Sequence, residues 1–357
     1  MRQLIVLGLA ALLLGGCVST TTQLAPVSPE AVEAEEVLQR ELVVSELNEA
    51  QRRLDDLAFP LLASATPLCP DRITPRIGLS FATVAAFEDE WAIAARSALG
   101  LGDTLMVTRV AAGSPADRAG LADGDQILSI DGEPVPIGED AAEAASMLLT
   151  RSFPDPVRLT VKRGPDVIDA SVEPVDVCDF TTVVMVEGDI NAFADGDRVI
   201  FPWAMMRFAD DEELIGVLGH EIAHNAMGHI EARKTNALWG GILGAVFDVA
   251  LATQGVSTYG ENTANFMSAA ARAFSQDFER EADYVGMYIL ARAGLPLETV
   301  PGFWRQFAQI NPTAISYAST HPTTAERFVR LQQTIEEIER KRAGGEELMP
   351  ELRVARE

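Results

Sequence analysis

The stretch GVLGHEIAHNAMGHIEAR, residues 216–233, holds three of the four histidines in a chain of 357 residues. On a helix, positions four apart differ by about 40° in azimuth, so His220 and His224 project from one face and can bind one cation. Glu221 lies beside them, about 100° away. In this HExxH pattern two neutral imidazoles bind zinc and the glutamate activates a water. We therefore predict one Zn2+ per chain, with Glu221 as the general base.

The residues around the motif favour a buried helix. Its apolar stripe consists of Leu214, Val217, Leu218 and Ile222. The acidic run at residues 210–213 suits the positive end of the helix dipole. His229 follows His220 by about 180° round a straight helix, so we expect it to be a core or supporting histidine and not a ligand of the same metal.

A third ligand is expected from QDFEREADYVG, residues 276–286. Glu279 and Asp283 are four apart and share a helix face, whereas Glu281 is turned about 200° from Glu279. We predict that Glu279 binds the metal and that Asp283 accepts a hydrogen bond from the distal nitrogen of a ligand histidine, which fixes that ring. The alternative is a solvated acidic helix face.

Four segments together resemble peptidase family M48, the HtpX-like and CAAX-prenyl-type zinc endopeptidases, over about residues 180–340. They are INAFA at 190–194, the HExxH segment, FEREAD, and STHPTTAERF at 319–328. The resemblance implies that His321 lies near the active site, where it stabilises the oxyanion or fills the metal's open position in a latent state; a structural role is the alternative. It also implies that Arg327 anchors the local fold. The segment DGDRVIFPWAMM departs from the family's glycine-rich hairpin.

The segment VAAGSPADRAGLADGDQILSIDGEPV, residues 110–135, closely resembles the core of bacterial PDZ domains. In such domains a glycine-bearing loop binds a peptide carboxylate, and the peptide adds to the sheet edge. The best match for that loop is RIGLSF, residues 76–81. The expected peptide-binding residues are therefore Arg76, Ile77, Gly78 and Leu79. A PDZ domain that serves only as a spacer is the alternative.

The N-terminus, MRQLIVLGLAALLLGGC, has one positive charge and about eleven apolar residues, which is typical of a secretory signal. The order Leu14-Gly15-Gly16-Cys17 resembles the bacterial lipobox. The resemblance implies a lipid on Cys17 and a protein anchored at the periplasmic face of the cell envelope. Because Val18 and Ser19 follow, the outer membrane is favoured. An ordinary signal peptide is the alternative.

Cys69 and Cys178 can form a disulfide in that compartment, or they can be two buried thiols. A bridge would close a loop of about 110 residues, which contributes roughly 4 to 5 kcal/mol in the chain-entropy model. The formal charge of −25 argues against a nucleic-acid partner, because no basic face is available to neutralise phosphates.

The expected fold is α+β: a mainly helical, zincin-like metallopeptidase domain with a small β-sheet follows a small mixed PDZ domain. The expected units are a signal peptide at 1–16, a lipidated tether at 17–30, a helical segment at 31–75, the PDZ domain at 76–177, the metallopeptidase domain at 178–345 and a frayed tail at 346–357. Ser28 and Pro29 are expected to begin the first helix. A hairpin turn is expected at residues 194–197.

The apolar segment at residues 237–253 is interrupted by Asp248. We predict a buried or site-covering helix, with membrane contact as the alternative. These features together predict an envelope zinc endopeptidase that hydrolyses peptide bonds in misfolded or unassembled proteins, with the PDZ domain selecting substrates. A substrate would add as a strand to residues 190–194. The alternative is a PDZ-bearing assembly factor or scaffold with a latent metal site.

Overall fold

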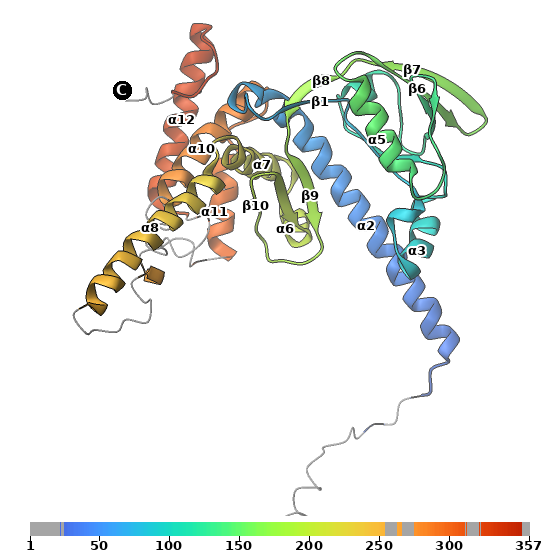
Figure 1. Cartoon of the computed structure of the whole chain (residues 1–357), viewed down its shortest axis with the longest axis horizontal. Helices are drawn as coiled ribbons and strands as arrows, with labels where there is room; N and C mark the ends of the chain where they lie inside the picture. The colour runs from blue at the N-terminus through green and yellow to red at the C-terminus, as the bar shows by residue number, and fades with distance from the viewer. Residues whose placement is uncertain are drawn as a thin grey trace, which may run out of the picture.

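The computed structural model describes residues 22, 25–253, 263–265, 275–310, 312, 321 and 323–351. A long N-terminal helix runs through the molecule, with a β-rich unit on one side and a mainly helical unit on the other (Figure 1). The buried apolar side chains form separate clusters in these two units, and a small third cluster lies where the long helix meets the β-rich unit. The predicted α+β class is confirmed.

The long helix, α2 (Pro29–Ser64), begins where the sequence predicts. Ser28 is its N-cap, and the Ser28 hydroxyl accepts a hydrogen bond from the Ala31 amide at 3.2 Å. The first turns are exposed, whereas Leu54, Ala58 and Leu61 are buried in the core of the helical unit. The segment expected as a separate unit at 31–75 is thus partly a wall of that core, and Val44 of the same helix is buried in the small third cluster.

The β-rich unit has a sheet of antiparallel strands in the order β2-β3-β4-β6-β7, with β5 paired to β4. The strands are β2 (Leu79–Ala82), β3 (Met106–Val110), β4 (Gln126–Ile130), β5 (Glu133–Pro134), β6 (Val157–Arg163) and β7 (Asp166–Val172). The helices are η2 (Val84–Ala86), α3 (Asp89–Leu99), α4 (Pro115–Arg118) and α5 (Ala141–Ser152). Its core extends from Ile77 to Val172.

A two-stranded ribbon and a disulfide join the two units. β1 (Ile73–Arg76) pairs antiparallel with β8 (Val175–Cys178), and the short helix η1 (Thr66–Leu68) precedes it. Cys69 and Cys178 are bonded, with their Cα atoms 5.9 Å apart, and both are buried. The predicted disulfide is therefore present. It closes the loop that contains the whole β-rich unit.

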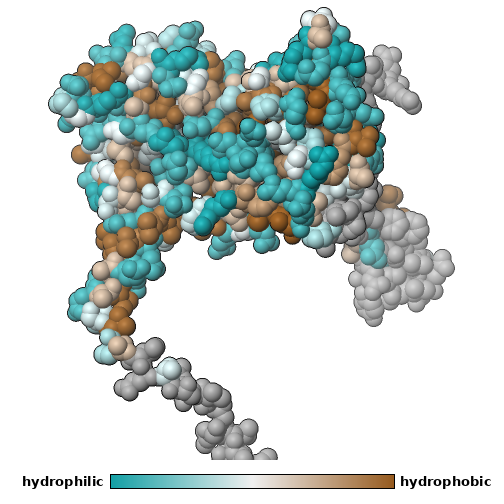
Figure 2. Space-filling model, turned by 180° about the vertical axis from the view of Figure 1, so that it is seen from behind, coloured by the Kyte–Doolittle hydropathy of each residue, from teal (hydrophilic) through white to brown (hydrophobic). Residues whose placement is uncertain are grey.

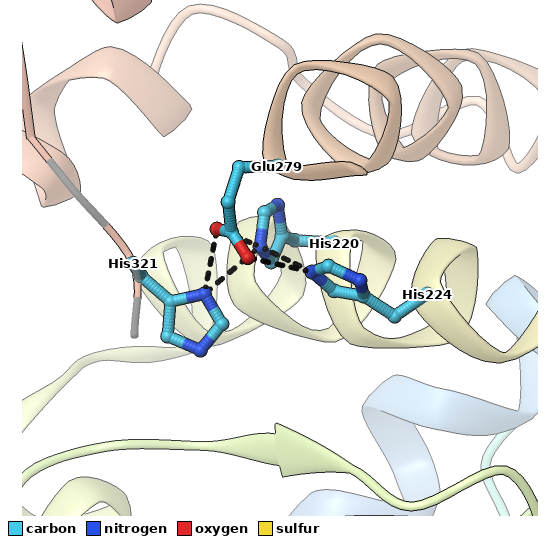
Figure 3. Close-up of side chains that lie close together, drawn as sticks. All are labelled: His220, His224, Glu279 and His321. Atoms are coloured by element: carbon cyan, nitrogen blue, oxygen red, sulfur yellow. Dashed lines mark hydrogen bonds and ion pairs between the residues drawn. The ribbon is translucent and has the colours of Figure 1, made fainter. Parts of the chain in front are cut away.

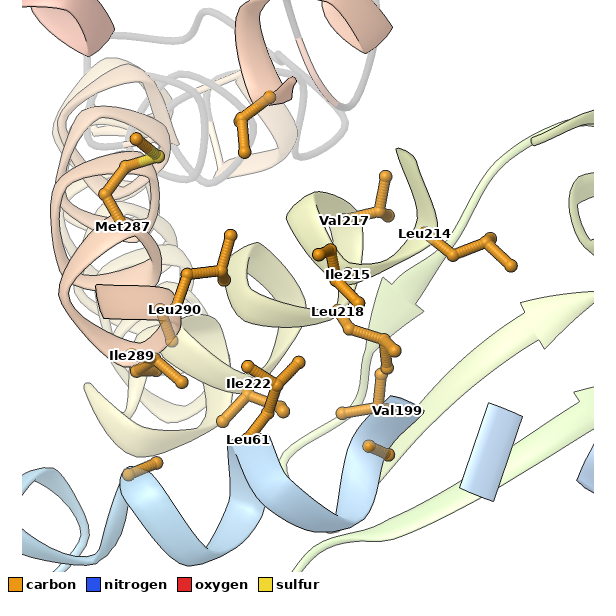
Figure 4. Packing of buried hydrophobic residues seen from close by; sticks show 14 of the residues in the cluster. Leu61, Val199, Leu214, Ile215, Val217, Leu218, Ile222, Met287, Ile289 and Leu290 are labelled. Atoms are coloured by element: carbon orange, nitrogen blue, oxygen red, sulfur yellow. The ribbon is translucent and has the colours of Figure 1, made fainter. Parts of the chain in front are cut away.

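The helical unit packs its helices beside a small sheet in the order β10-β11-β9. The strands are β9 (Thr181–Met185), β10 (Phe193–Ala194) and β11 (Arg198–Pro202). The helices are α6 (Trp203–Phe208), α7 (Asp211–Ala226), α8 (His229–Ala252), α10 (Ser275–Arg292), α11 (Val300–Ile310) and α12 (Ala325–Gly344). Figure 4 shows apolar side chains of α2, β11, α7 and α10 meeting in the core. The hairpin predicted at residues 194–197 is the β10–β11 connection.

Two predictions about this unit need correction. The segment at 237–253 was expected to be a buried or site-covering helix, and the buried form is wrong, because large side chains along α8 are about half exposed or more, among them Trp239 at 60% and Val246 at 62%. The tail is not frayed over residues 346–351, since Lys341 donates a hydrogen bond to the Met349 carbonyl and Pro350 is buried. Among the described residues, no helix is long and apolar enough to cross a bilayer.

Candidate metal centre

The HExxH segment lies on α7, whose start is fixed by a capping box. Asp210 accepts a hydrogen bond from the Glu213 amide at 2.9 Å, and the Glu213 carboxylate accepts one from the Asp210 amide at 3.1 Å. The acidic run thus lies at the positive end of the helix, as predicted. From Leu214 to Asn225 every residue of α7 is buried, so the helix carries its polar side chains inside the protein.

Four side chains from three parts of the chain meet at one point (Figure 3). His220, His224, Glu279 and His321 each offer a ligand atom, and these atoms all lie within 4.8 Å of one another. The Glu279 carboxylate, from α10, lies 3.3 Å from the Nε2 atoms of both His220 and His224 and 2.9 Å from His321 Nδ1. The two Nε2 atoms are 3.2 Å apart. The three side chains predicted as ligands are therefore together.

The chemistry of this cluster fits a divalent metal ion. Two imidazole nitrogens and a carboxylate oxygen facing one point are a donor set that zinc commonly uses. Glu221 gives an independent indication, because both of its carboxylate oxygens are buried without a hydrogen-bond partner among the described residues. Its Oε1 lies 3.5 Å from His321 Nε2. A buried carboxylate is costly unless a charge or a hydrogen-bond donor compensates it, and a metal-site water supplies such a donor.

The protonation of the histidines follows from these carboxylates. Burial opposes the charged form of His220, but hydrogen bonds to Asp283 and Glu279 outweigh it and raise the pKa to about 9. Burial lowers the pKa of His224. Burial also opposes the charge on Glu279, yet its histidine neighbours, His321 first, hold its pKa well below the usual value. Burial also opposes the charge on His321, but Glu279 and Glu221 outweigh it and raise its pKa. Without a metal, His220 and His321 therefore supply the positive charge that the carboxylates favour.

The residues predicted to support the ligands lie behind them. Asp283 Oδ1 is 2.9 Å from His220 Nδ1, the nitrogen that faces away from the cluster. Arg327 donates a hydrogen bond to the same Asp283 oxygen at 2.6 Å, and its guanidinium covers the Trp304 ring. This chain from Arg327 to His220 holds the imidazole in one orientation. Trp304 was not expected from the sequence, because only the packing of α11 against α7 brings it here.

His229 is a supporting histidine, as predicted, but the assumption of a straight helix is wrong. α7 ends at Ala226, Gly228 adopts a φ of +66°, and α8 begins at His229. The turn brings His229 Nδ1 to 2.9 Å from His224 Nδ1, and His229 Nε2 lies 3.1 Å from Glu281. Glu281 was set aside in the sequence because it points away from Glu279. The signal for its role was Gly228, a residue typical of a helix end.

The edge strand of the small sheet lies against the cluster. His321 Nε2 is 3.3 Å from the Ala192 carbonyl oxygen, just before β10. Asn225 fixes this hairpin to α7, because it accepts a hydrogen bond from the Gly196 amide at 2.8 Å and donates one to the Arg198 carbonyl at 3.0 Å. The segment expected to receive a substrate strand is therefore held beside the candidate metal ligands.

The four predicted peptide-binding residues of the PDZ unit, Arg76 to Leu79, have different structural roles. Arg76 lies in β1 and pairs with Asp179 at 3.0 Å. Ile77 is buried, and its carbonyl accepts a hydrogen bond from the Ala116 amide. Gly78, with a φ of +74°, and Leu79 lead into β2, the edge strand. The predicted lipidation site, Cys17, lies outside the described residues.

The fold and the site define a mainly helical α+β metallopeptidase domain attached to a PDZ domain. Residues 163–335 match peptidase family M48 and residues 106–163 match a PDZ domain, so the chain carries an M48 domain together with a PDZ domain. A crystal structure of the HtrA3 PDZ domain bound to a phage-derived ligand is 27% identical over 29% of this chain and 88% of that one, with a TM-score of 0.22.

Curated relatives include three metallopeptidases. The mitochondrial metalloendopeptidase OMA1 of Arabidopsis thaliana is 30% identical over 46% of this chain and 33% of its own length. The β-barrel assembly-enhancing protease of Yersinia pestis is 32% identical over 33% of this chain and 26% of its length. The metalloprotease YcaL of Escherichia coli (strain K12) is 27% identical over 43% of this chain and 61% of its length. The matches thus span less than two thirds of each of these relatives.

Proposed function

We propose that the protein is a zinc-dependent endopeptidase of the bacterial cell envelope that hydrolyses misfolded or unassembled proteins. One observation carries the proposal. Donor atoms of His220, His224 and Glu279 converge on one point, and the carboxylate of Glu221 is buried beside them without a hydrogen-bond partner among the described residues. An arrangement that served only stability would give a buried carboxylate a hydrogen-bond donor, whereas Glu221 has none among the described residues and has an ion-pair contact of 3.5 Å with His321 Nε2.

In this proposal His220, His224 and Glu279 hold the ion. Bound zinc supplies a Lewis acid that polarises the scissile carbonyl and makes water a stronger acid. Glu221 accepts the proton of the attacking water and returns it to the leaving amine. Asp283 and Arg327 keep His220 in the orientation that binding requires, since their hydrogen bonds fix its distal nitrogen.

A substrate strand would pair with residues 190–194, next to the ligands. Backbone pairing depends little on side chains and therefore suits unfolded polypeptides of varied sequence. His321 lies in the way, because its Nε2 is near the Ala192 carbonyl and its Nδ1 completes the group of four donors. We therefore favour the latent role of His321 over an oxyanion role: the imidazole fills the position that substrate and water need, and must leave before cleavage.

The cellular setting is inferred from three features. A lipid on Cys17 would hold the chain at the periplasmic face of the outer membrane. The PDZ edge strand β2, which begins at Leu79, would select protein ends. A relative that carries the name β-barrel assembly-enhancing protease supports unassembled envelope proteins as the substrate class.

The test compares the full chain with Glu221→Gln, each loaded with zinc, for cleavage of fluorescein-labelled casein. We expect cleavage to fall by about 100- to 10,000-fold, the usual contribution of a general base, while zinc content stays the same. Glu231→Gln is the matched control, because Glu231 is 73% exposed on the next helix. Equal cleavage by Glu221→Gln would contradict the role of Glu221. Equal inactivity of both zinc-loaded proteins would favour the scaffold alternative or a latent wild type.

His321→Ala separates these last two outcomes. If His321 blocks the site, the variant cleaves casein faster than the wild type, and Glu221→Gln introduced into it removes the gain. If His321 stabilises the oxyanion, the variant loses about 100- to 1,000-fold in turnover, as happens when one oxyanion donor is removed. If neither the wild type nor the His321→Ala variant cleaves casein, although the variant still binds zinc, the scaffold alternative is favoured.

A further inference from the structure

The distal half of α8 exposes a continuous apolar surface. The apolar side chains concerned are between 44% and 65% exposed: Leu238, Trp239, Ile242, Leu243, Val246 and Val249. At 100° per residue they occupy one sector of the helix, roughly 140° wide. The sequence from Thr235 to Phe247 contains no charged residue. Single exposed apolar residues are ordinary, but a contiguous patch marks an interaction surface.

The opposite side of α8 carries its small and polar residues. Gly241 and Gly244 are buried, and Asp248 accepts hydrogen bonds from the Thr263 amide at 2.9 Å and the Thr263 hydroxyl at 2.7 Å. These three positions lie within roughly 60° of one another on the helix. α8 therefore differs from an ordinary surface helix in water, because its small residues face the protein and its large apolar residues face outward. Lipid-contacting helices have this arrangement, because close packing favours small residues and acyl chains favour large apolar ones.

We propose that this apolar surface of α8 lies in the interface of the bilayer that holds the Cys17 lipid. The inference rests on the proposed lipid anchor. It concerns contact with one leaflet, since no described helix is fit to cross a membrane. Trp239 suits such a position, because indole rings favour the headgroup level of the bilayer. Arg233 and Lys234, exposed at the base of the helix, would remain in the headgroup region.

The arrangement of the molecule supports a bilayer as the partner. The N-terminal end of α2 and the distal end of α8 point to the same side, the lower edge of Figure 1. The eleven residues between Cys17 and Pro29 reach about 36 Å when extended, so an anchored chain can bring that side to the membrane. Other large apolar side chains are also exposed, Leu38 and Leu42 on α2 and Trp91 and Ile93 on α3. Figure 2 shows brown atoms on the part of the molecule from which the N-terminal chain extends.

A lipid anchor would allow even a small apolar surface to bind the bilayer. Once a lipid holds the chain, contact with the same bilayer becomes intramolecular, and weak attraction is sufficient. The net charge of −25 makes attraction to anionic lipids a poor alternative driving force. We therefore expect an apolar contact that persists at high salt.

The test uses the full lipidated chain in vesicles of phosphatidylcholine and phosphatidylglycerol that contain acyl-chain nitroxide lipid. A nitrobenzoxadiazole dye is attached to Val246→Cys or, as the matched control, to Val329→Cys, an exposed valine of α12. Cys69 and Cys178 are bonded to each other, so the introduced thiol is the one that reacts. Flotation with the vesicles and casein cleavage are measured on the same samples.

We expect the dye at 246 to be quenched at least about threefold more than the dye at 329, at low and high salt, because interfacial helices lie about 5–10 Å into the headgroup boundary. Equal, weak quenching in a chain that floats overturns the docking surface but leaves the anchor and the peptidase intact. Dye at 246 that is shielded from iodide but not quenched by lipid also overturns it, in favour of a second copy or a client polypeptide. A chain that does not float contradicts the anchor and the docking surface together, and leaves the cleavage result to stand alone.

Discussion

Gly219 and Gly286 face each other where α7, the helix that carries the HExxH residues, crosses α10, the helix that carries Glu279. A Cβ atom added to Gly286 would lie 2.9 Å from the carbonyl carbon and oxygen of Gly219 and 3.0 Å from the backbone nitrogen of His220. Backbone atoms cannot move aside as a flexible side chain can. The crossing therefore sets the distance between the helix that carries two of the proposed metal ligands and the helix that carries the third.

Gly286→Ala should push α7 and α10 apart. We expect it to lower the free energy of unfolding by about 1–3 kcal/mol, as overpacking does, and to weaken zinc binding because His220 moves away from Glu279. Urea unfolding and competition with a chelator measure the two effects. Gly302→Ala on α11 is the matched control, since nothing lies within 4 Å of its added Cβ. A Gly286→Ala variant as stable as the control would show that the crossing is not tight.

The metal-free protein should lose stability as the pH rises from 6.5 to 9. Asp283 and Glu279, against the effect of burial, raise the pKa of His220 from 6.5 to about 9. A raised folded-state pKa stabilises the fold fully below the unfolded value, and the contribution disappears as the pH passes the folded value. The lowered pKa of His224 acts below pH 6.5 and so outside this window.

Zinc binding should release the His220 proton below pH 9, so the apparent affinity should increase with pH up to that value. Melting temperatures with chelator and with zinc, measured across this range, check both statements. The zinc-induced gain should grow with pH. A gain that is constant from pH 6.5 to 9 would contradict the raised pKa.

His229 should matter for metal affinity although it is not a ligand. It holds the distal nitrogen of His224, so His229→Ala frees that ring and should weaken zinc binding about 10- to 100-fold, the usual effect of removing such a partner. Chelator competition measures the affinity. Glu281→Gln is the control, because its amide oxygen still accepts from His229, and it should change the affinity little. A folded His229→Ala protein with unchanged zinc affinity would contradict the assignment.

The disulfide should stabilise the protein strongly. Cys69 and Cys178 are 109 positions apart, and a loop of that length contributes about 4–5 kcal/mol in the chain-entropy model. Replacing both cysteines with alanine should lower the free energy of unfolding by about that amount, as followed in urea. Reductant should destabilise the wild type to a similar extent and have no effect on the double variant. A double variant that unfolds at the same urea concentration as the wild type would exclude this role.

The sequence by itself determined the parts of this protein that depend on local spacing. His220, Glu221 and His224 share one helix, so their common face follows from helix geometry alone, and the same holds for Glu279 and Asp283. The start of α2 at Ser28 and Pro29 also follows from local capping chemistry. The PDZ segment could be identified because its turns require glycine at fixed positions.

Only the tertiary structure decided what depends on contacts between distant segments. The break at Gly228 turns His229 back to His224, and Glu281 then meets it from α10. The position of His321 beside Ala192, and that of the Arg327 guanidinium over the Trp304 ring, need the packing of separate segments. The exposure of α8 could not be predicted either, because an apolar pattern states which residues avoid water and does not state whether protein or lipid covers them.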